Sequence, residues 1–153
     1  MEHLQRIAGD VGSRKGEGAE LVTGGERVGS DLERGFFYRP TVLTEVRDHM
    51  RIAREEIFGP VLSLMPYDGL DEAVLRANAT DHGLVAAIWT KDLATAHTLP
   101  PRIAAGTVFV NQLPLIDPGA PWCGFGLSGW GRELDSYSID GFTESQSVFI
   151  NLS

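Results

Sequence analysis

Two short stretches of the sequence carry residue types that could do chemistry. The first, APWCGFGLSGWGRE, spaces Gly124, Gly126 and Gly129 as G-x-G-x-x-G, the pattern of a dinucleotide-binding loop, beside Cys123. That pattern binds a pyrophosphate only between a strand and a helix. Here it follows the turn-forming sequence DPGAP and precedes further glycine, so we expect a glycine-rich loop rather than a phosphate-binding turn.

Cys123 is the only cysteine of the chain, and a lone cysteine is more often a small apolar residue than a nucleophile. A nucleophilic thiol needs a base or a positive field to lower its pKa. The histidines are scattered and lack metal-ligand spacing, so the sequence predicts no metal site. They are His3, His49, His82 and His97.

The second stretch is EEIFGPV, residues 55–61, which places two carboxylates before an aromatic residue and a Gly-Pro turn. One interpretation is a surface turn with Phe58 tucked inside. The other is a binding site in which the Glu56 carboxylate accepts hydrogen bonds from hydroxyl groups beside the apolar face of Phe58. That pairing would suit a ribose and a flat ring, and the residues alone leave both interpretations open.

The elements that must position these residues follow from apolar periodicity and from the positions of Gly and Pro. We expect a β-α-β-α-β alternation and therefore an α/β fold with a mostly parallel sheet flanked by helices. Pro40 indicates an edge or irregular strand, and the run 84–90 a strand buried on both faces. The expected helices are 2–15, 70–79 and 92–99, and the expected strands are 19–23, 36–46, 59–67, 84–90, 107–111 and, as a separate strand leaving the body, 145–152.

Composition limits the classes of partner. The chain has 153 residues and a formal net charge of −8, with no basic stripe, which argues against nucleic acid or an anionic membrane as the main partner. No window reaches the roughly 18 apolar residues of a membrane helix, and the polar N-terminus does not look like a signal peptide. We expect a cytoplasmic protein.

Several further motifs accompany EEIFGPV in a fixed order, and together they resemble the NAD(P)-dependent aldehyde dehydrogenase superfamily over nearly the whole chain. The resemblance implies the C-terminal portion of such an enzyme, with residues 1–141 as the latter part of the catalytic domain and 142–153 as an oligomerisation strand or tail. The motifs are EGAELVTGGER, FFYRPTVLTEV, DEAVLRAN, HGLVAAIWTKD, AGTVFVN, APWCGFGLSGWGRE and FTESQSV.

The resemblance assigns roles to individual residues. Glu56 matches the glutamate that binds the nicotinamide ribose hydroxyls, Phe58 the phenylalanine near the nicotinamide, and Asn111 an asparagine that supports the active site. The glycine-rich segment becomes a loop beside the substrate tunnel, in which Cys123 stands where glycine is usual. The positions that match the lining of the aldehyde tunnel are Pro114, Ile116 and Trp122.

Trp122 leaves two interpretations of the substrate open. A tryptophan at this position resembles the betaine- and amino-aldehyde branch, in which aromatic rings hold a cationic group. The other interpretation is that any aromatic residue fills the position.

The resemblance also implies what this chain does not hold: the nucleophilic cysteine, the general-base glutamate and the Rossmann-like domain. We therefore expect no aldehyde oxidation by the chain alone and no tight binding of the NAD or NADP that the complete enzyme uses. We expect a homo-oligomer formed through residues 142–152. The alternative function is a non-catalytic interaction module that pairs with full-length or complementary subunits.

Overall fold

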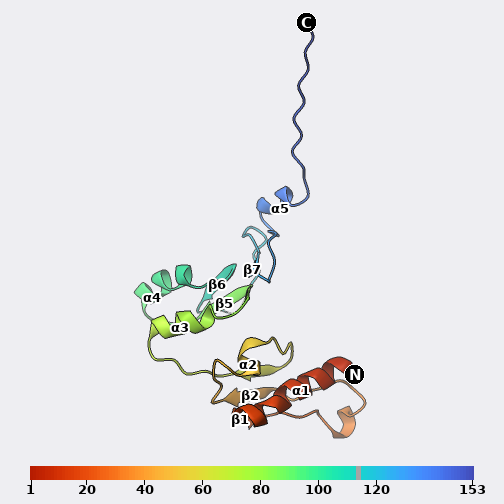
Figure 1. Ribbon diagram of the computed structural model, residues 1–153, viewed down its shortest axis with the longest axis vertical. Helices are drawn as coiled ribbons and strands as arrows, with labels where there is room; N and C mark the ends of the chain where they lie inside the picture. Colours follow the sequence, from red (N-terminus) through yellow and green to blue (C-terminus); the bar gives the residue numbers. More distant parts are fainter. Residues whose placement is uncertain (113–114) are drawn as a thin grey trace. The chain divides into compact units, whose positions relative to one another are not determined.

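The computed structural model describes residues 1–112 and 115–153, which divide into two compact units, Met1–Gly69 and Leu70–Ser153 (Figure 1). Each unit has its own helices and strands. The first contains α1 (Glu2–Glu17), β1 (Glu20–Thr23), the 3-10 turn η1 (Ser30–Leu32), β2 (Thr41–Thr44), α2 (Arg51–Arg54) and β3 (Val61–Ser63). The second contains α3 (Leu70–Ala77), β4 (His82–Gly83), β5 (Val85–Ile88), α4 (Leu93–Thr98), η2 (Pro100–Arg102), β6 (Thr107–Val110), β7 (Phe125–Gly126) and α5 (Tyr137–Asp140).

The first unit packs α1 against a three-stranded sheet with strand order β1-β2-β3. β1 and β2 are antiparallel, and β2 and β3 are parallel. Ile7 and Val11, one helical turn apart on α1, share a core with the fully buried Leu43 of β2. α1 ends at Gly18, whose left-handed backbone is the usual way to stop a helix. The helix and strand expected at the start of the chain are thus confirmed.

The sequence predicts an edge or irregular strand over 36–46. The edge position is wrong, and the irregularity is confirmed by a shift of register between β1 and β2. β2 begins at Thr41, directly after Pro40, and it is the central strand of its sheet. Because Pro40 lies outside the strand, its missing N–H removes no hydrogen bond from the ladder. The Thr41 N–H, next along the chain, donates to the Pro60 carbonyl on the parallel neighbour at 2.8 Å.

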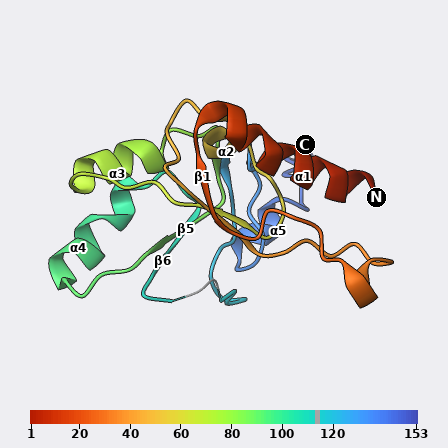
Figure 2. The ribbon, with the colours of Figure 1, turned by 90° about the horizontal axis from the view of Figure 1, so that it is seen from below.

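The second unit contains a parallel pair, β5 and β6, joined through α4 (Figure 2). Asp92 begins α4 by accepting the backbone N–H groups of Ala94 and Thr95. The Asn78 side chain donates to the Arg102 carbonyl at 2.9 Å and accepts the Ala104 N–H at 2.8 Å, which fixes the approach to β6. The helices expected over 70–79 and 92–99 and the strand over 107–111 are confirmed within a few residues.

Two expectations about the sheet fail. The strand over 84–90 is not buried on both faces, because Val85, Ala86 and Ile88 are half-buried and Ala87 is exposed. β3 also pairs with β2 and not with β5, so the β-α-β-α-β alternation does not form one sheet among the described residues. Burial of both faces of a parallel sheet requires packed elements on both sides, and β5 remains partly exposed. The fold is α/β with small sheets and helices.

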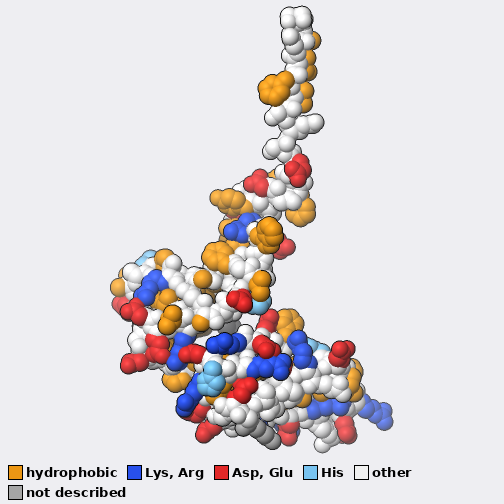
Figure 3. Space-filling model, viewed as in Figure 1, with side chains coloured by type: hydrophobic (Ala, Val, Ile, Leu, Met, Phe, Trp, Pro, Cys, Tyr) orange, Lys and Arg blue, Asp and Glu red, His pale blue; other side chains and the backbone are white. Residues whose placement is uncertain are grey.

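Beyond α5 the chain is extended, with no helix or strand over residues 143–153 (Figure 1). The space-filling view shows hydrophobic side chains along this segment (Figure 3). Phe149 and Leu152 are 95% and 94% exposed. The predicted division at residue 141 and the predicted role of this segment in oligomerisation stay predictions. Within the described part of the chain, no helix has the length and apolar character needed to cross a membrane.

Candidate functional site

The Glu56–Phe58 turn connects α2 to β3 and presents two side chains to solvent. Ile57 is 9% exposed and belongs to the core of the first unit, whereas Glu56 is exposed and Phe58 is 69% exposed. Burial of Ile57 therefore fixes the turn to the core while its two neighbours face outward. The interpretation in which Phe58 is tucked inside is wrong.

The first two turns of α1 hold this segment from a distance of more than 50 residues in sequence. His3 Nε2 lies 2.9 Å from the Phe58 carbonyl oxygen, and Arg6 Nη2 donates to the Ile57 carbonyl at 3.3 Å. A Cβ at Gly59 would lie 2.7 Å from the end of the Ile7 side chain, so a larger residue here would require Ile7 to shift. The turn is thus built from two parts of the sequence.

Ion pairs beside the turn leave Glu56 available. Arg51 pairs with Glu55 at 2.7 Å and with the buried Asp10 at 3.0 Å. The hydrogen bond to Glu55, and then the charges of Glu55 and Asp10, raise the pKa of Arg51 above its ordinary value. In residues 1–112 and 115–153, the Glu56 carboxylate has no hydrogen-bond or ion-pair partner, so its oxygens can accept hydrogen bonds from a ligand.

Glu56 and Phe58 line one cavity of about 330 Å³. An unpartnered carboxylate accepts hydrogen bonds from neighbouring hydroxyl groups, and an exposed phenyl ring offers a flat apolar face. These two groups fit a ribose that carries an aromatic ring. The residues that line the cavity are Ile52, Glu55, Glu56, Ile57, Phe58, Gly59, Val61 and Ser63.

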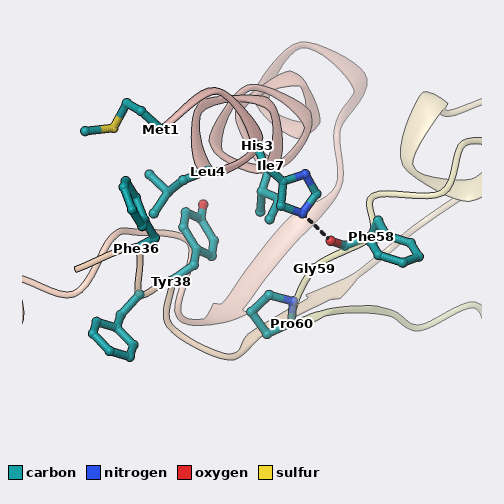
Figure 4. A pocket seen from close by; sticks show the side chains of 10 residues that line it. Met1, His3, Leu4, Ile7, Phe36, Tyr38, Phe58, Gly59 and Pro60 are labelled. Atoms are coloured by element: carbon teal, nitrogen blue, oxygen red, sulfur yellow. Dashed lines mark hydrogen bonds between the residues drawn. The ribbon is translucent and has the colours of Figure 1, made fainter.

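A second cavity, of about 530 Å³, shares Phe58 and Gly59 with the first (Figure 4). Its walls are mainly aromatic and aliphatic. Burial raises the pKa of Tyr38 in this wall above its ordinary value, and nearby Arg14 opposes that effect. The lining residues are Met1, His3, Leu4, Ile7, Phe36, Phe37, Tyr38, Phe58, Gly59 and Pro60.

In the second unit, Asn111 joins the carboxyl ends of β5 and β6. Its side chain accepts the Thr90 N–H at 2.8 Å and donates to the Thr90 carbonyl at 2.7 Å. Asn111 itself has a left-handed backbone, with φ of 55°. The side chain therefore fixes the point at which the chain leaves β6, and its role in supporting an active site stays a prediction.

The glycine-rich segment forms a tight loop and not a phosphate-binding turn, as the sequence predicts. Phe125 and Gly126 form β7, which pairs with β4, and no helix begins until α5. A Cβ at Gly124 would lie 2.5 Å from Ser128, and one at Gly126 would meet the Asp81 carbonyl. Because these glycines have no side chain, the loop can pack closely against the neighbouring segments.

Trp122 and Cys123 lie in the same loop. Trp122 is half-buried, and its backbone N–H and carbonyl pair with those of Glu133 at 2.7 and 2.8 Å. Both residues line a cavity of about 250 Å³ together with Glu133. The Cys123 thiol is 3.9 Å from the Gly106 carbonyl. Gly106 precedes β6 and Asn111 follows it, so Cys123 and Asn111 lie near opposite ends of that strand.

The structure thus brings Glu56 and Phe58 together in the first unit, while the other predicted residues lie in the second. Ile116 is 56% exposed in a loop, and Pro114 lies outside the described residues. Sequence reasoning missed His3 and Arg6, whose i, i+3 spacing gives no sign of carbonyl partners so distant in sequence. The described residues hold no cluster of three metal-ligating side chains.

The known proteins that are similar to this chain are aldehyde dehydrogenases. The profile of the aldehyde dehydrogenase family matches residues 1–148. The putative aldehyde dehydrogenase DhaS of Bacillus subtilis (strain 168) is 44% identical over 151 residues, which are 99% of this chain and 30% of that protein. The mitochondrial aldehyde dehydrogenase of Homo sapiens is 41% identical over 149 residues, or 97% of this chain and 28% of that protein.

Solved structures of aldehyde dehydrogenases are also similar to this chain. An NAD+ complex of aldehyde dehydrogenase from Bacillus cereus superposes with a TM-score of 0.92 at 42% identity, covering 99% of this chain and 30% of that one. Betaine aldehyde dehydrogenase from Staphylococcus aureus in complex with NAD+ gives 0.90 at 36% identity, covering 93% and 28%. The chain spans about 30% of the length of these relatives.

Proposed function

Because this chain belongs to the aldehyde dehydrogenase family, we propose that it supplies the part of an NAD(P)-dependent aldehyde dehydrogenase that contacts the nicotinamide half of the cofactor. The complete enzyme would oxidise an aldehyde to a carboxylic acid. The observation that carries the proposal is the cavity lined by Glu56, whose carboxylate has no partner among the described residues, and by the exposed Phe58. Relatives solved with NAD+ support the same cofactor class.

Each residue has a specific task in this proposal. Glu56 accepts hydrogen bonds from the ribose hydroxyl groups, and Phe58 packs against the nicotinamide side of the sugar. The chemistry that the nicotinamide supplies when bound is acceptance of hydride. Two contacts at one end of a dinucleotide bury little of it, so the 153-residue chain alone binds NAD more weakly than the micromolar range and oxidises no aldehyde.

A chimeric enzyme tests the proposal. In it, this chain replaces the matching 30% of the Bacillus cereus aldehyde dehydrogenase, to which it is 42% identical. The chimera is expected to oxidise aldehydes with NAD. Glu56→Gln is expected to lower kcat/KM for NAD by about tenfold or more, because it replaces a charged acceptor with a neutral one and so weakens the hydrogen bonds from the ribose hydroxyl groups. A folded, active chimera in which Glu56→Gln leaves kcat/KM for NAD unchanged would overturn the proposed role.

The substrate class rests on Trp122. Trp122 is half-buried and lines a cavity that Glu133 also lines, and an aromatic ring near a carboxylate is a combination that attracts a cation. We infer a preference for amino aldehydes over neutral aldehydes. In the active chimera, Trp122→Ala should reduce that preference by about fivefold, since a cation–π contact contributes about 0.5–2 kcal/mol. Trp122→Phe is the matched control, and an unchanged preference in Trp122→Ala rejects the inference.

A second role, as an interaction module, is favoured by the extended segment after α5. Phe142 is 89% exposed and Ile150 is 76% exposed, and residues 143–153 form no strand with other described residues. An extended apolar segment with free backbone groups is a template for pairing with another chain. The proposed partner is a second copy of this chain or a longer member of the same family.

A further inference from the structure

The backbone of Phe58 is strained. Its φ is 53°, in the left-handed region that a bulky side chain rarely adopts. Such a conformation persists only where the surroundings impose it. Burial of Ile57 on one side, and the close approach of Gly59 to Ile7 on the other, hold the two ends of the turn.

His3 supplies the contact at the strained residue itself. Its Nε2–H donates to the Phe58 carbonyl at 2.9 Å, since a carbonyl oxygen only accepts (Figure 4). Its ring also meets the Phe58 ring edge-on, with centroids 6.2 Å apart and an interplanar angle of 68°. In Figure 4 the Phe58 carbonyl points toward His3, and the Phe58 ring points away from Leu4 and Tyr38.

Arg6 makes a second hydrogen bond of this kind, to the residue before Phe58. It lies one helical turn after His3, on the same face of α1, and donates to the Ile57 carbonyl. Two successive carbonyls of the turn therefore accept hydrogen bonds from one helix. Among the described side chains, His3 alone holds the peptide plane after Phe58, and Arg6 holds the one before it.

We propose that His3 is a positioning residue: its hydrogen bond to the Phe58 carbonyl maintains the left-handed turn that directs Glu56 and Phe58 to one cavity. The ligand of that cavity rests on the proposed function, whereas the backbone effect does not. His3 acts through the turn and makes no contact with the reacting atoms.

The test distinguishes the effect of the His3 N–H donor from the effect of the His3 ring. His3→Gln keeps an N–H donor and removes the ring, and His3→Phe keeps an aromatic edge and removes the donor. Gln5→Leu, an exposed position on another face of α1, is the matched control. The first readout is the NMR carbonyl shift and backbone coupling of Phe58 in the 153-residue chain. The second is the dissociation constant for NAD, from shifts of the Glu56 and Phe58 amides.

In His3→Phe, the Phe58 carbonyl signal and coupling should change, and NAD should bind about fivefold more weakly, as expected for loss of one ordinary hydrogen bond. His3→Gln and Gln5→Leu should resemble the parent chain. His3→Ala repeats the test without added bulk should His3→Phe not fold.

Unchanged Phe58 signals in a folded His3→Phe or His3→Ala chain would overturn the positioning role, whatever happens to NAD binding. Altered Phe58 signals with unchanged NAD affinity would overturn the link from the turn to the ligand. If the parent chain shows no NAD-dependent shift at Glu56 or Phe58, the NAD comparison is made as kcat/KM for NAD in the chimera, where an unchanged value in His3→Phe would overturn the link to the ligand. The Phe58 signals of the chain still decide whether His3 holds the turn.

Discussion

At the scale of single residues, the turn around Ile57 combines an anchor with two outward-facing groups. The residues alone leave a buried turn and a ligand-binding turn open for Glu56 and Phe58, and the exposed Phe58 removes the first of these interpretations. The sequence does not predict that His3 and Arg6 hold the turn, since hydrogen bonds to backbone carbonyls leave no pattern in the side chains of the acceptor segment. The exposed Phe58 also could not be inferred from hydrophobicity, which alone favours burial.

Gly106 gives a prediction at this scale. A Cβ on Gly106 would meet the Cys123 carbonyl and lie 2.9 Å from its sulfur, so Gly106→Ala must displace the loop that carries Trp122. We expect a loss of about 1–3 kcal/mol in the free energy of unfolding, as for overpacking elsewhere, measured by urea denaturation. Gly9→Ala is the control, because nothing lies within 4 Å and alanine favours its helix. Equal stability of Gly106→Ala and the parent chain would contradict the packing of this loop.

At the scale of elements, most helices and strands follow from the sequence, and the pairing of strands does not. Apolar spacing predicts α1, α3, α4 and β6, because these elements depend on local contacts and on caps such as Asp92. The position of β2 at the centre of its sheet depends on which strands reach it from either side. That information lies in tertiary contacts. Pro40 considered alone therefore gives the wrong prediction of an edge strand.

The start of α4 gives a pH-dependent prediction. Hydrogen bonds from the Thr95 hydroxyl, the Thr95 N–H and the Ala94 N–H lower the pKa of Asp92 below its ordinary value. Its charged form is therefore favoured in the folded chain. The resulting stability is present above the unfolded carboxyl pKa of about 3.9 and is lost as the pH falls through the lower folded value.

Asp92→Ala should therefore speed hydrogen exchange of the α4 amides at neutral pH, with a difference from the parent chain that disappears in strong acid. Asp92→Asn keeps a capping oxygen without the charge and should give an intermediate, pH-independent effect over this range. A difference between Asp92→Ala and the parent chain that persists undiminished in acid would show that the charge of Asp92 does not stabilise α4.

At the scale of the whole molecule, the chain leaves an apolar segment exposed to solvent at its C-terminal end. Residues 142–153 are exposed and include several large apolar side chains. Apolar surface of this kind favours association, while the net charge of −8 opposes close approach of copies. Added salt should therefore strengthen self-association.

Removal of residues 142–153 should lower the average mass in sedimentation velocity at high protein concentration. A chain that ends at Gly141 keeps α5 and serves as the comparison. A parent chain that remains monomeric at high concentration, or a truncated chain that associates equally well, would contradict pairing through this segment.

The most direct test of the central claim is a titration of NAD into the ¹⁵N-labelled chain and its Glu56→Gln variant, followed by NMR. We predict that the largest shifts occur at Glu56, Ile57 and Phe58, that binding is weaker than micromolar, and that Glu56→Gln removes most of the effect. Shifts confined to other residues, or binding that Glu56→Gln leaves unchanged, would contradict the assignment of this turn to the nicotinamide ribose.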